Sequence, residues 1–156
     1  DGDVLLLAQA KQQWLNAPAW QGVRRYVEDT LVVRDWFELT VAQNVVSDGL
    51  VYPLLFHKLD EQLSANGAGQ VGMLTEFMRL WFAESQRWVD ALLKTVINES
   101  AGNKALVESW VDRWSQRSIE ALRPLVGLGL HEAALDAVCC EFEKKQKKVG
   151  LTGVKP

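Results

Sequence analysis

The stretch from residue 74 to residue 96, LTEFMRLWFAESQRWVDALLKTV, predicts a long helix and decides the fold class. Its apolar side chains recur largely three and four positions apart, a spacing that places them on one face of a helix. Charged side chains fall mostly on the other side. The apolar set is Leu74, Phe77, Met78, Trp81, Trp88, Val89, Leu92 and Val96, and the charged set is Arg79, Glu84, Arg87, Asp90 and Lys94.

Two further helices are predicted on the C-terminal side of this stretch. After Ser100-Ala-Gly-Asn103, where Asn103 is a candidate cap, the apolar pattern resumes and continues until Pro124 and the Gly127/Gly129 pair end it. A last helix is expected from about His131 to Lys148, with Glu141–Lys145 and Glu143–Lys147 pairs at the favourable spacing of four. The resumed pattern consists of Leu106, Val107, Trp110, Val111, Trp114, Ile119 and Leu122.

On the N-terminal side, the turn-rich residues 64–69 predict a loop, and three helical segments precede it. A short helix is expected from Val4 to Leu15 and a second from about Pro18 to Asp29, because proline is tolerated in a first helical turn. Between residues 30 and 63 apolar side chains surround much of the helix, which predicts burial on several sides. Gly49 and Pro53 predict a kink near Leu50.

No alternating β-pattern competes with these helices, so the sequence predicts an all-α fold of long antiparallel helices, in one helical region over residues 1–156. The 48% apolar and 24% charged composition is that of a folded globular chain. A net charge of −3 argues against a nucleic-acid partner. No apolar run approaches the roughly 20 residues of a membrane span.

The two cysteines, Cys139 and Cys140, are adjacent, which disfavours a disulfide between them and indicates a reducing, cytoplasmic compartment. The start, Asp1-Gly2-Asp3, lacks a methionine and is typical of a fragment. The seven tryptophans are candidates for the core or for a contact with a partner, because large aromatic anchors are enriched at both.

A helical bundle raises the question of a di-iron centre, which is built from inward-facing Glu and Glu-x-x-His motifs. The only histidines are His57 and His131, and leucine stands three positions before each of them. The 74–96 helix instead carries Glu76-x-x-Arg79 and Glu84-x-x-Arg87, whose arginines do not bind metals and predict salt bridges. We therefore expect no catalytic, no cofactor-binding and no metal-binding residue in this chain.

Several polar residues keep two interpretations at this point. Gln43, Asn44 and Asp48, within the most apolar segment, are either interhelical hydrogen-bonding groups or remnants of a former site or contacts to a partner. His57 is either a structural or interface histidine or a proton-transfer or ligand group, and His131 carries less signal still. The lysine-rich end, comprising Lys144, Lys145, Lys147 and Lys148, is either a solvated helix terminus or a surface for an acidic partner.

The segment 34–55, RDWFELTVAQNVVSDGLVYPLL, closely resembles the beta subunit of the hydroxylase of bacterial multicomponent phenol hydroxylases. The resemblance extends to toluene monooxygenases and, more distantly, to soluble methane monooxygenase. It covers roughly residues 20–148, and its most specific parts are Ala42-Gln-Asn and Asp48-Gly-Leu-Val-Tyr-Pro. Supporting matches are Leu74-Thr-Glu-Phe-Met, Glu84-Ser-Gln-Arg-Trp-Val-Asp-Ala, and Asn103-Lys-Ala-Leu with Trp110 and Trp114.

The resemblance implies a ferritin-like helical bundle that is partial here, because the chain looks like the C-terminal half of such a subunit. It implies a non-catalytic role bracing the alpha subunit, among further hydroxylase subunits. It further implies that a di-iron centre in alpha, reduced with electrons from NADH, activates O₂ and hydroxylates an aromatic ring to a catechol. No iron ligand of the family has a matching position in this chain.

Two rival classes remain: an autonomous helical protein-binding module without enzymatic role, and a working ferritin-like metalloenzyme, against which the ligand count argues. Because a partial bundle exposes apolar faces, we also expect the isolated chain to self-associate.

Overall fold

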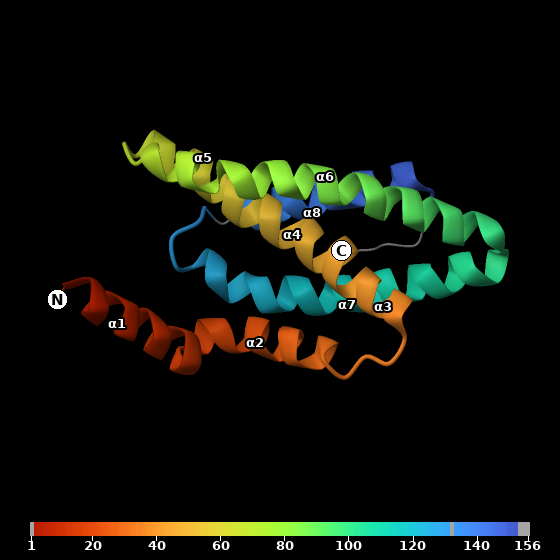
Figure 1. Ribbon diagram of the computed structural model, residues 1–156, viewed down its shortest axis with the longest axis horizontal. Helices are drawn as coiled ribbons and strands as arrows, with labels where there is room; N and C mark the ends of the chain where they lie inside the picture. The colour runs from red at the N-terminus through yellow and green to blue at the C-terminus, as the bar shows by residue number, and fades with distance from the viewer. Residues whose placement is uncertain (1, 132, 153–156) are drawn as a thin grey trace.

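The computed structural model describes residues 2–131 and 133–152, and within them the chain consists of helices joined by short loops (Figure 1). The helix that contains residues 74–96 and the helix that follows it are long, and no strand occurs in the described part. In chain order they are α1 (Gly2–Asn16), α2 (Pro18–Thr30), α3 (Trp36–Thr40), η1 (Val41–Ser47), α4 (Asp48–Pro53), η2 (Leu54–Lys58), α5 (Leu59–Ala65), α6 (Gln70–Glu99), α7 (Ala101–Val126) and α8 (Ala133–Val149).

The five elements from α3 to α5 form one continuous helical rod, in which η1 and η2 are wide, π-helical turns. The rod begins at Asp35, whose carboxylate accepts hydrogen bonds from the amides of Phe37 at 2.8 Å and Glu38 at 3.2 Å. In the wide turns each amide bonds five residues back, as from Asp48 to the carbonyl of Gln43. The helix therefore continues through Leu50, and its irregularities lie on either side of α4.

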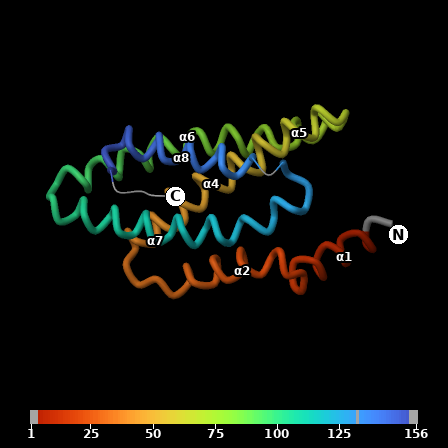
Figure 2. The backbone as a smooth tube through the Cα atoms, turned by 180° about the vertical axis from the view of Figure 1, so that it is seen from behind, coloured from red at the N-terminus to blue at the C-terminus, as the bar shows by residue number. Residues whose placement is uncertain are grey.

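The core forms where α7 packs between α2 and η1 and also contacts α6 (Figure 1). Figure 2 shows α8 running along α6, and α8 also packs against α4 and α7. Two glycines permit the closest approaches. A Cβ on Gly22 of α2 would lie 3.0 Å from Cα of Ala121 in α7, and one on Gly49 of α4 would lie 2.9 Å from the ring of Phe142 in α8.

Helix limits agree with the sequence pattern except at a few ends. Residues 31–35 are not helical, so the buried rod begins later than predicted. The cap of α7 is Ser100 rather than Asn103, because the Ser100 hydroxyl accepts the amide hydrogen of Asn103 at 3.0 Å. Pro124 lies inside α7, which ends two residues later. The expected start of the last helix adjoins residue 132, which lies outside the described residues, and α8 begins at Ala133.

Within the described helices, none is both long enough and apolar enough to cross a bilayer.

Candidate functional site

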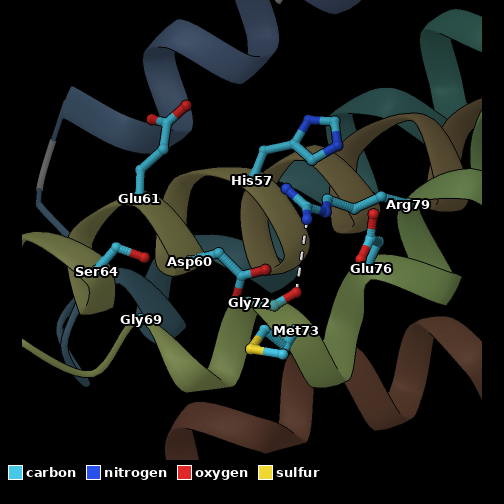
Figure 3. Close-up of a pocket in the computed structure, with 9 residues that line it drawn as sticks. All are labelled: His57, Asp60, Glu61, Ser64, Gly69, Gly72, Met73, Glu76 and Arg79. Carbon is cyan, nitrogen blue, oxygen red and sulfur yellow. Dashed lines mark hydrogen bonds between the residues drawn. The ribbon is translucent and has the colours of Figure 1, made fainter.

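A cleft of about 810 Å³ lies between the end of the rod, formed by η2 and α5, and the beginning of α6 (Figure 3). Both polar and charged side chains line it, and they come from η2, from α5 and, beyond the 66–69 loop, from α6. The lining residues are His57, Asp60, Glu61, Ser64, Gly69, Gly72, Met73, Glu76 and Arg79.

Asp60 and Arg79 carry opposite charges and line this cleft without forming an ion pair with each other. Asp60 is only 5% exposed, and its carboxylate accepts a hydrogen bond from the hydroxyl of Thr75. The Arg79 guanidinium reaches back along α6 and donates to the carbonyl of Gly72 at 3.5 Å (Figure 3). Its Nε is buried and has no hydrogen-bond partner in the described part of the chain. The Arg79 guanidinium forms no ion pair with the exposed Glu76 in the described chain, so the salt bridge predicted for these two residues is wrong.

The second Glu-x-x-Arg motif behaves as predicted. Arg87 and Glu84 form an ion pair at 2.7 Å on the outside of α6, with both side chains largely exposed. A guanidinium carries its proton at physiological pH and offers no lone pair to a metal. Among the described residues, no group of three histidine, cysteine, aspartate or glutamate side chains is arranged to hold a metal ion. The donor set of α6 therefore does not fit a di-iron centre.

At the wide turn η1, side chains of two other helices donate hydrogen bonds to backbone carbonyls of the rod. The Tyr26 hydroxyl of α2 donates to the carbonyl of Ala42 at 2.6 Å, and the Gln86 amide of α6 donates to the carbonyl of Asn44 at 3.1 Å. A π-helical turn shifts the backbone hydrogen-bond pattern, which leaves carbonyls accessible to such side chains. Interhelical hydrogen bonding thus gathers at η1.

Of the polar residues predicted to serve this role, Gln43 makes a long interhelical hydrogen bond to Thr30 at 3.4 Å. Asn44 donates through its side chain to the Asp48 carboxylate at 3.2 Å, one turn further along the rod. Burial raises the pKa of Asp48, and the hydrogen bond from Asn44 opposes that shift. The interhelical interpretation therefore fits Gln43 and the Asn44 backbone, while Asp48 is a half-buried carboxyl without an ion-pair partner in the described chain.

The remaining candidate residues are the two histidines and the two cysteines. His57 lines the cleft, and the backbone amide of His131 donates to the side chain of Gln62 at 3.1 Å. Both cysteines are free: Cys139 is buried, which raises the pKa of its thiol, and Cys140 is exposed.

At the lysine-rich end, Lys145 pairs with Asp90 of α6 at 3.3 Å instead of with Glu141, because α8 lies against α6 there. The predicted Glu141–Lys145 pair is therefore wrong. Partial burial lowers the pKa of Lys145, while Asp90 opposes that shift. Lys144, Lys147 and Lys148 are exposed, as a solvated terminus requires.

Tryptophans lie both in the core and on the surface of the described chain. Trp114 is buried, its ring Nε1 donates to the Glu38 carboxylate at 3.1 Å, and its ring meets Tyr26 edge-on at 5.3 Å. Trp36, Trp81 and Trp88 are exposed.

The apolar stripe that predicted α6 lies mostly on the outside of the molecule. Leu74, Phe77, Trp81 and Trp88 are 82%, 70%, 45% and 50% exposed, whereas Val89 is buried. The short helix α1 packs against α2 and likewise exposes its Val4–Leu7 run. Folded monomers rarely expose large contiguous apolar patches, and such patches are found at contacts between chains.

The fold and these residues define a helical-bundle protein with a packed core and with further apolar faces of α1 and α6 at its surface. Comparison with known proteins identifies the family: the model described as Methane/Phenol/Alkene Hydroxylase matches residues 4–100. The chain belongs to this family.

Characterised relatives of the chain are hydroxylase and oxygenase components. It is 52% identical to the oxygenase component DmpL of phenol 2-monooxygenase from Pseudomonas sp. strain CF600, over 93% of this chain and 44% of that protein. It is 29% identical to the beta subunit of the toluene-4-monooxygenase hydroxylase component from Ectopseudomonas mendocina, over 71% of this chain and 35% of that one.

The crystal structure of phenol hydroxylase from Pseudomonas sp. OX1, determined under xenon pressure, contains a chain that is 43% identical and superposes with a TM-score of 0.88. The match covers 92% of this chain and 44% of that one, so this chain spans less than half the length of the relatives it matches. The predicted all-α, ferritin-like fold is confirmed.

Proposed function

We propose that this chain is a non-catalytic part of the beta subunit of a phenol-hydroxylase-type monooxygenase, corresponding to the C-terminal half of that subunit, and that it braces a catalytic alpha subunit. The relatives named as phenol 2-monooxygenase and toluene-4-monooxygenase components support the class of complex. Electrons from NADH, O₂ and an aromatic substrate would then be used by alpha, where the di-iron centre resides.

The observation that carries the non-catalytic role is the Glu84–Arg87 pair. In a ferritin-like centre a Glu-x-x-His motif supplies two ligands from one helix. Here the second position holds an arginine, and the glutamate is engaged in an exposed ion pair at 2.7 Å. No step of the hydroxylation reaction is assigned to residues of this chain.

Two interhelical hydrogen bonds at η1 support the proposed bracing role. Tyr26 and Gln86 tie α2 and α6 to the rod through backbone carbonyls, which fixes the angle between three helices. A subunit that holds ligand-bearing helices of its neighbour in place needs such fixed angles, because metal ligands tolerate only small displacements.

The test is to co-express this chain with the catalytic subunit of a related phenol hydroxylase, and to measure iron in the isolated chain and in the complex. We expect iron only in the complex, at a content unchanged by Glu84→Gln. Stoichiometric iron in the isolated chain, or its loss in Glu84→Gln, would overturn the non-catalytic assignment. Failure to co-purify with the catalytic subunit would favour an autonomous binding module.

The exposed faces of α1 and α6 further lead us to propose that the isolated chain self-associates. Sedimentation velocity at several concentrations tests this. A monomer that persists across a hundredfold concentration range would contradict it.

A further inference from the structure

A second cavity lies where α4 and η2 of the rod meet α6 and α8. Its volume is about 380 Å³, and pockets that bind small molecules measure about 300–1,000 Å³. Apolar side chains from α4, α6 and α8 line it together with a few polar ones. We call it the three-helix cavity, and its apolar side chains are Pro53, Phe82, Ala83, Val138 and Phe142.

Two aromatic rings of the three-helix cavity are held in place by their neighbours. Phe82 stacks on Tyr52 of α4 with the ring centroids 5.0 Å apart and the ring planes within 9° of parallel. Phe142 is buried against Gly49, where a Cβ would lie only 2.9 Å from its ring. Aromatic rings attract one another beyond the area that they bury. The lining therefore suits a ligand that contains a ring.

Arg79 is the polar residue of this lining with the most unused hydrogen-bonding capacity. A guanidinium has five N–H donors, and Arg79 makes one long hydrogen bond, of 3.5 Å, to the carbonyl of Gly72. Its Nε is buried and has no partner, and the guanidinium forms no ion pair within the described chain. A carboxylate matches a guanidinium because its two oxygens accept two parallel hydrogen bonds.

The other nitrogen groups of the lining differ from Arg79, with one exception. The Gln86 amide donates to the carbonyl of Asn44 at 3.1 Å, and Lys145 pairs with Asp90 at 3.3 Å. The exception is His57, whose side chain makes no hydrogen bond within the described chain. His57 and Arg79 line both the three-helix cavity and the larger cleft, so the two hollows adjoin at these side chains (Figure 3).

We propose that the three-helix cavity binds a small aromatic carboxylate, whose ring packs on Phe82 and Phe142 and whose carboxylate binds the Arg79 guanidinium. His57 offers a further N–H donor to the same carboxylate. The assignment rests on the cavity of this chain, and it does not depend on the proposed role in a hydroxylase.

The charges around the site restrict the ligand further. Asp60 and Glu76 line the cleft on the other side of Arg79, and Glu141 is exposed at the three-helix cavity. These carboxylates repel a multiply charged anion such as phosphate more strongly than a single carboxylate. A neutral ring would leave Arg79 without a counter-ion. The ligand that meets both conditions carries one negative charge and one apolar ring.

The first experiment titrates the chain with benzoate and follows the heat of binding. We expect saturable binding with a Kd below about 1 mM, as small ligands of good efficiency reach. Benzamide, which has the same ring and no charge, and inorganic phosphate should each bind at least about tenfold more weakly. Magnetisation transfer in NMR spectra from the benzoate ring protons to the Val138 methyl groups should locate the ligand. No saturable binding of benzoate, or equal binding of benzamide, would overturn the proposal.

The two Glu-x-x-Arg motifs of α6 provide a matched pair of variants. Arg79→Gln is expected to weaken benzoate binding about tenfold or more, because a charge-assisted bidentate contact is lost. Arg87→Gln removes an arginine that pairs with Glu84 on the outside of α6, and it should leave the affinity unchanged. Unchanged affinity in Arg79→Gln would overturn the proposal.

A second pair of variants tests the cavity without changing a charge. Ala83 is exposed and lines the three-helix cavity, whereas Ala91 is exposed on α6 outside that lining. Ala83→Trp should fill the site and weaken benzoate binding at least about tenfold, and Ala91→Trp should not. Circular dichroism is expected to show both variants folded, since both side chains face solvent. Equal affinity in the two variants would place the ligand elsewhere and overturn the proposal.

Two further titrations separate benzoate from other occupants of the cavity. The affinity should not change with the concentration of the chain; an affinity that falls as this concentration rises would assign the cavity to a second copy. Binding should also persist when the chain is co-expressed with the part of DmpL that lies outside the match. Loss of binding there would assign the cavity to the remaining polypeptide, and either loss would overturn the proposal. Neither outcome bears on the iron content that tests the proposed function.

Discussion

Removing the Tyr26 hydroxyl should show how much the hydrogen bond that α2 donates to the wide turn η1 contributes to the stability of the fold. In Tyr26→Phe the carbonyl of Ala42 loses its 2.6 Å hydrogen bond inside the core, while the ring keeps its edge-on contact with Trp114. A hydrogen bond contributes about 0.5–1.5 kcal/mol, and a buried acceptor left without a donor costs about 1–3 kcal/mol. We expect a loss of about 1–2 kcal/mol in the free energy of unfolding.

The matched control is Tyr52→Phe. Tyr52 is stacked on Phe82 with ring centroids 5.0 Å apart, and its hydroxyl makes no hydrogen bond within the described chain. The control should change the free energy of unfolding by less than about 0.5 kcal/mol, as is usual where no buried partner is lost. Urea unfolding followed by tryptophan fluorescence measures both variants. Equal effects of the two substitutions would refute the reasoning that η1 needs the donor from α2.

Two other substitutions test packing and burial in the same assay. Gly22→Ala should lower the free energy of unfolding by about 1–2 kcal/mol, because the new methyl would lie 3.0 Å from the Ala121 backbone and push α2 away from α7. The control is Gly72→Ala, whose methyl would meet nothing within 4 Å. It should raise the free energy of unfolding by up to about 1 kcal/mol. A gain in both glycine variants would contradict the close approach. Asp48→Asn should stabilise near pH 7, because burial raises the pKa of Asp48 above its ordinary 3.8 and the folded state opposes its ionisation. That gain should disappear as the pH falls below 3.8, where the carboxyl is neutral in both states. A pH-independent effect of Asp48→Asn would contradict the role of burial.

The sequence predicted the helices because their signals are local. Pro18 fixes the start of α2, and the 66–69 loop separates the rod from α6. Ser100 and Asn103 both suit a cap, and only the backbone direction at Ser100, extended rather than helical, decides between them.

The side of α6 that faces inward could not be predicted, because both of its faces are apolar. The row through Leu74, Phe77 and Trp81 has the stronger spacing, yet Val89 and Leu93 form the packed face. Periodicity identifies a helix and not the neighbour it meets. For the same reason the contacts of Tyr26 with Ala42 and of Asp60 with Thr75 could not be predicted, because a side chain alone does not indicate which residue more than a dozen positions away it will contact.

The wide turns of the rod also bear on how this chain tolerates change over evolution. Each residue of an α-helix rotates the chain by about 100°, so an extra residue normally turns every later side chain away from its partners. A wide turn accommodates that extra residue locally. Between Val41 and Lys58 the rod contains two such places, and gain or loss of a single codon there can leave α3 and α5 facing the same neighbours. Length variation among homologous rods should therefore be found at η1 and η2 before it is found in α4.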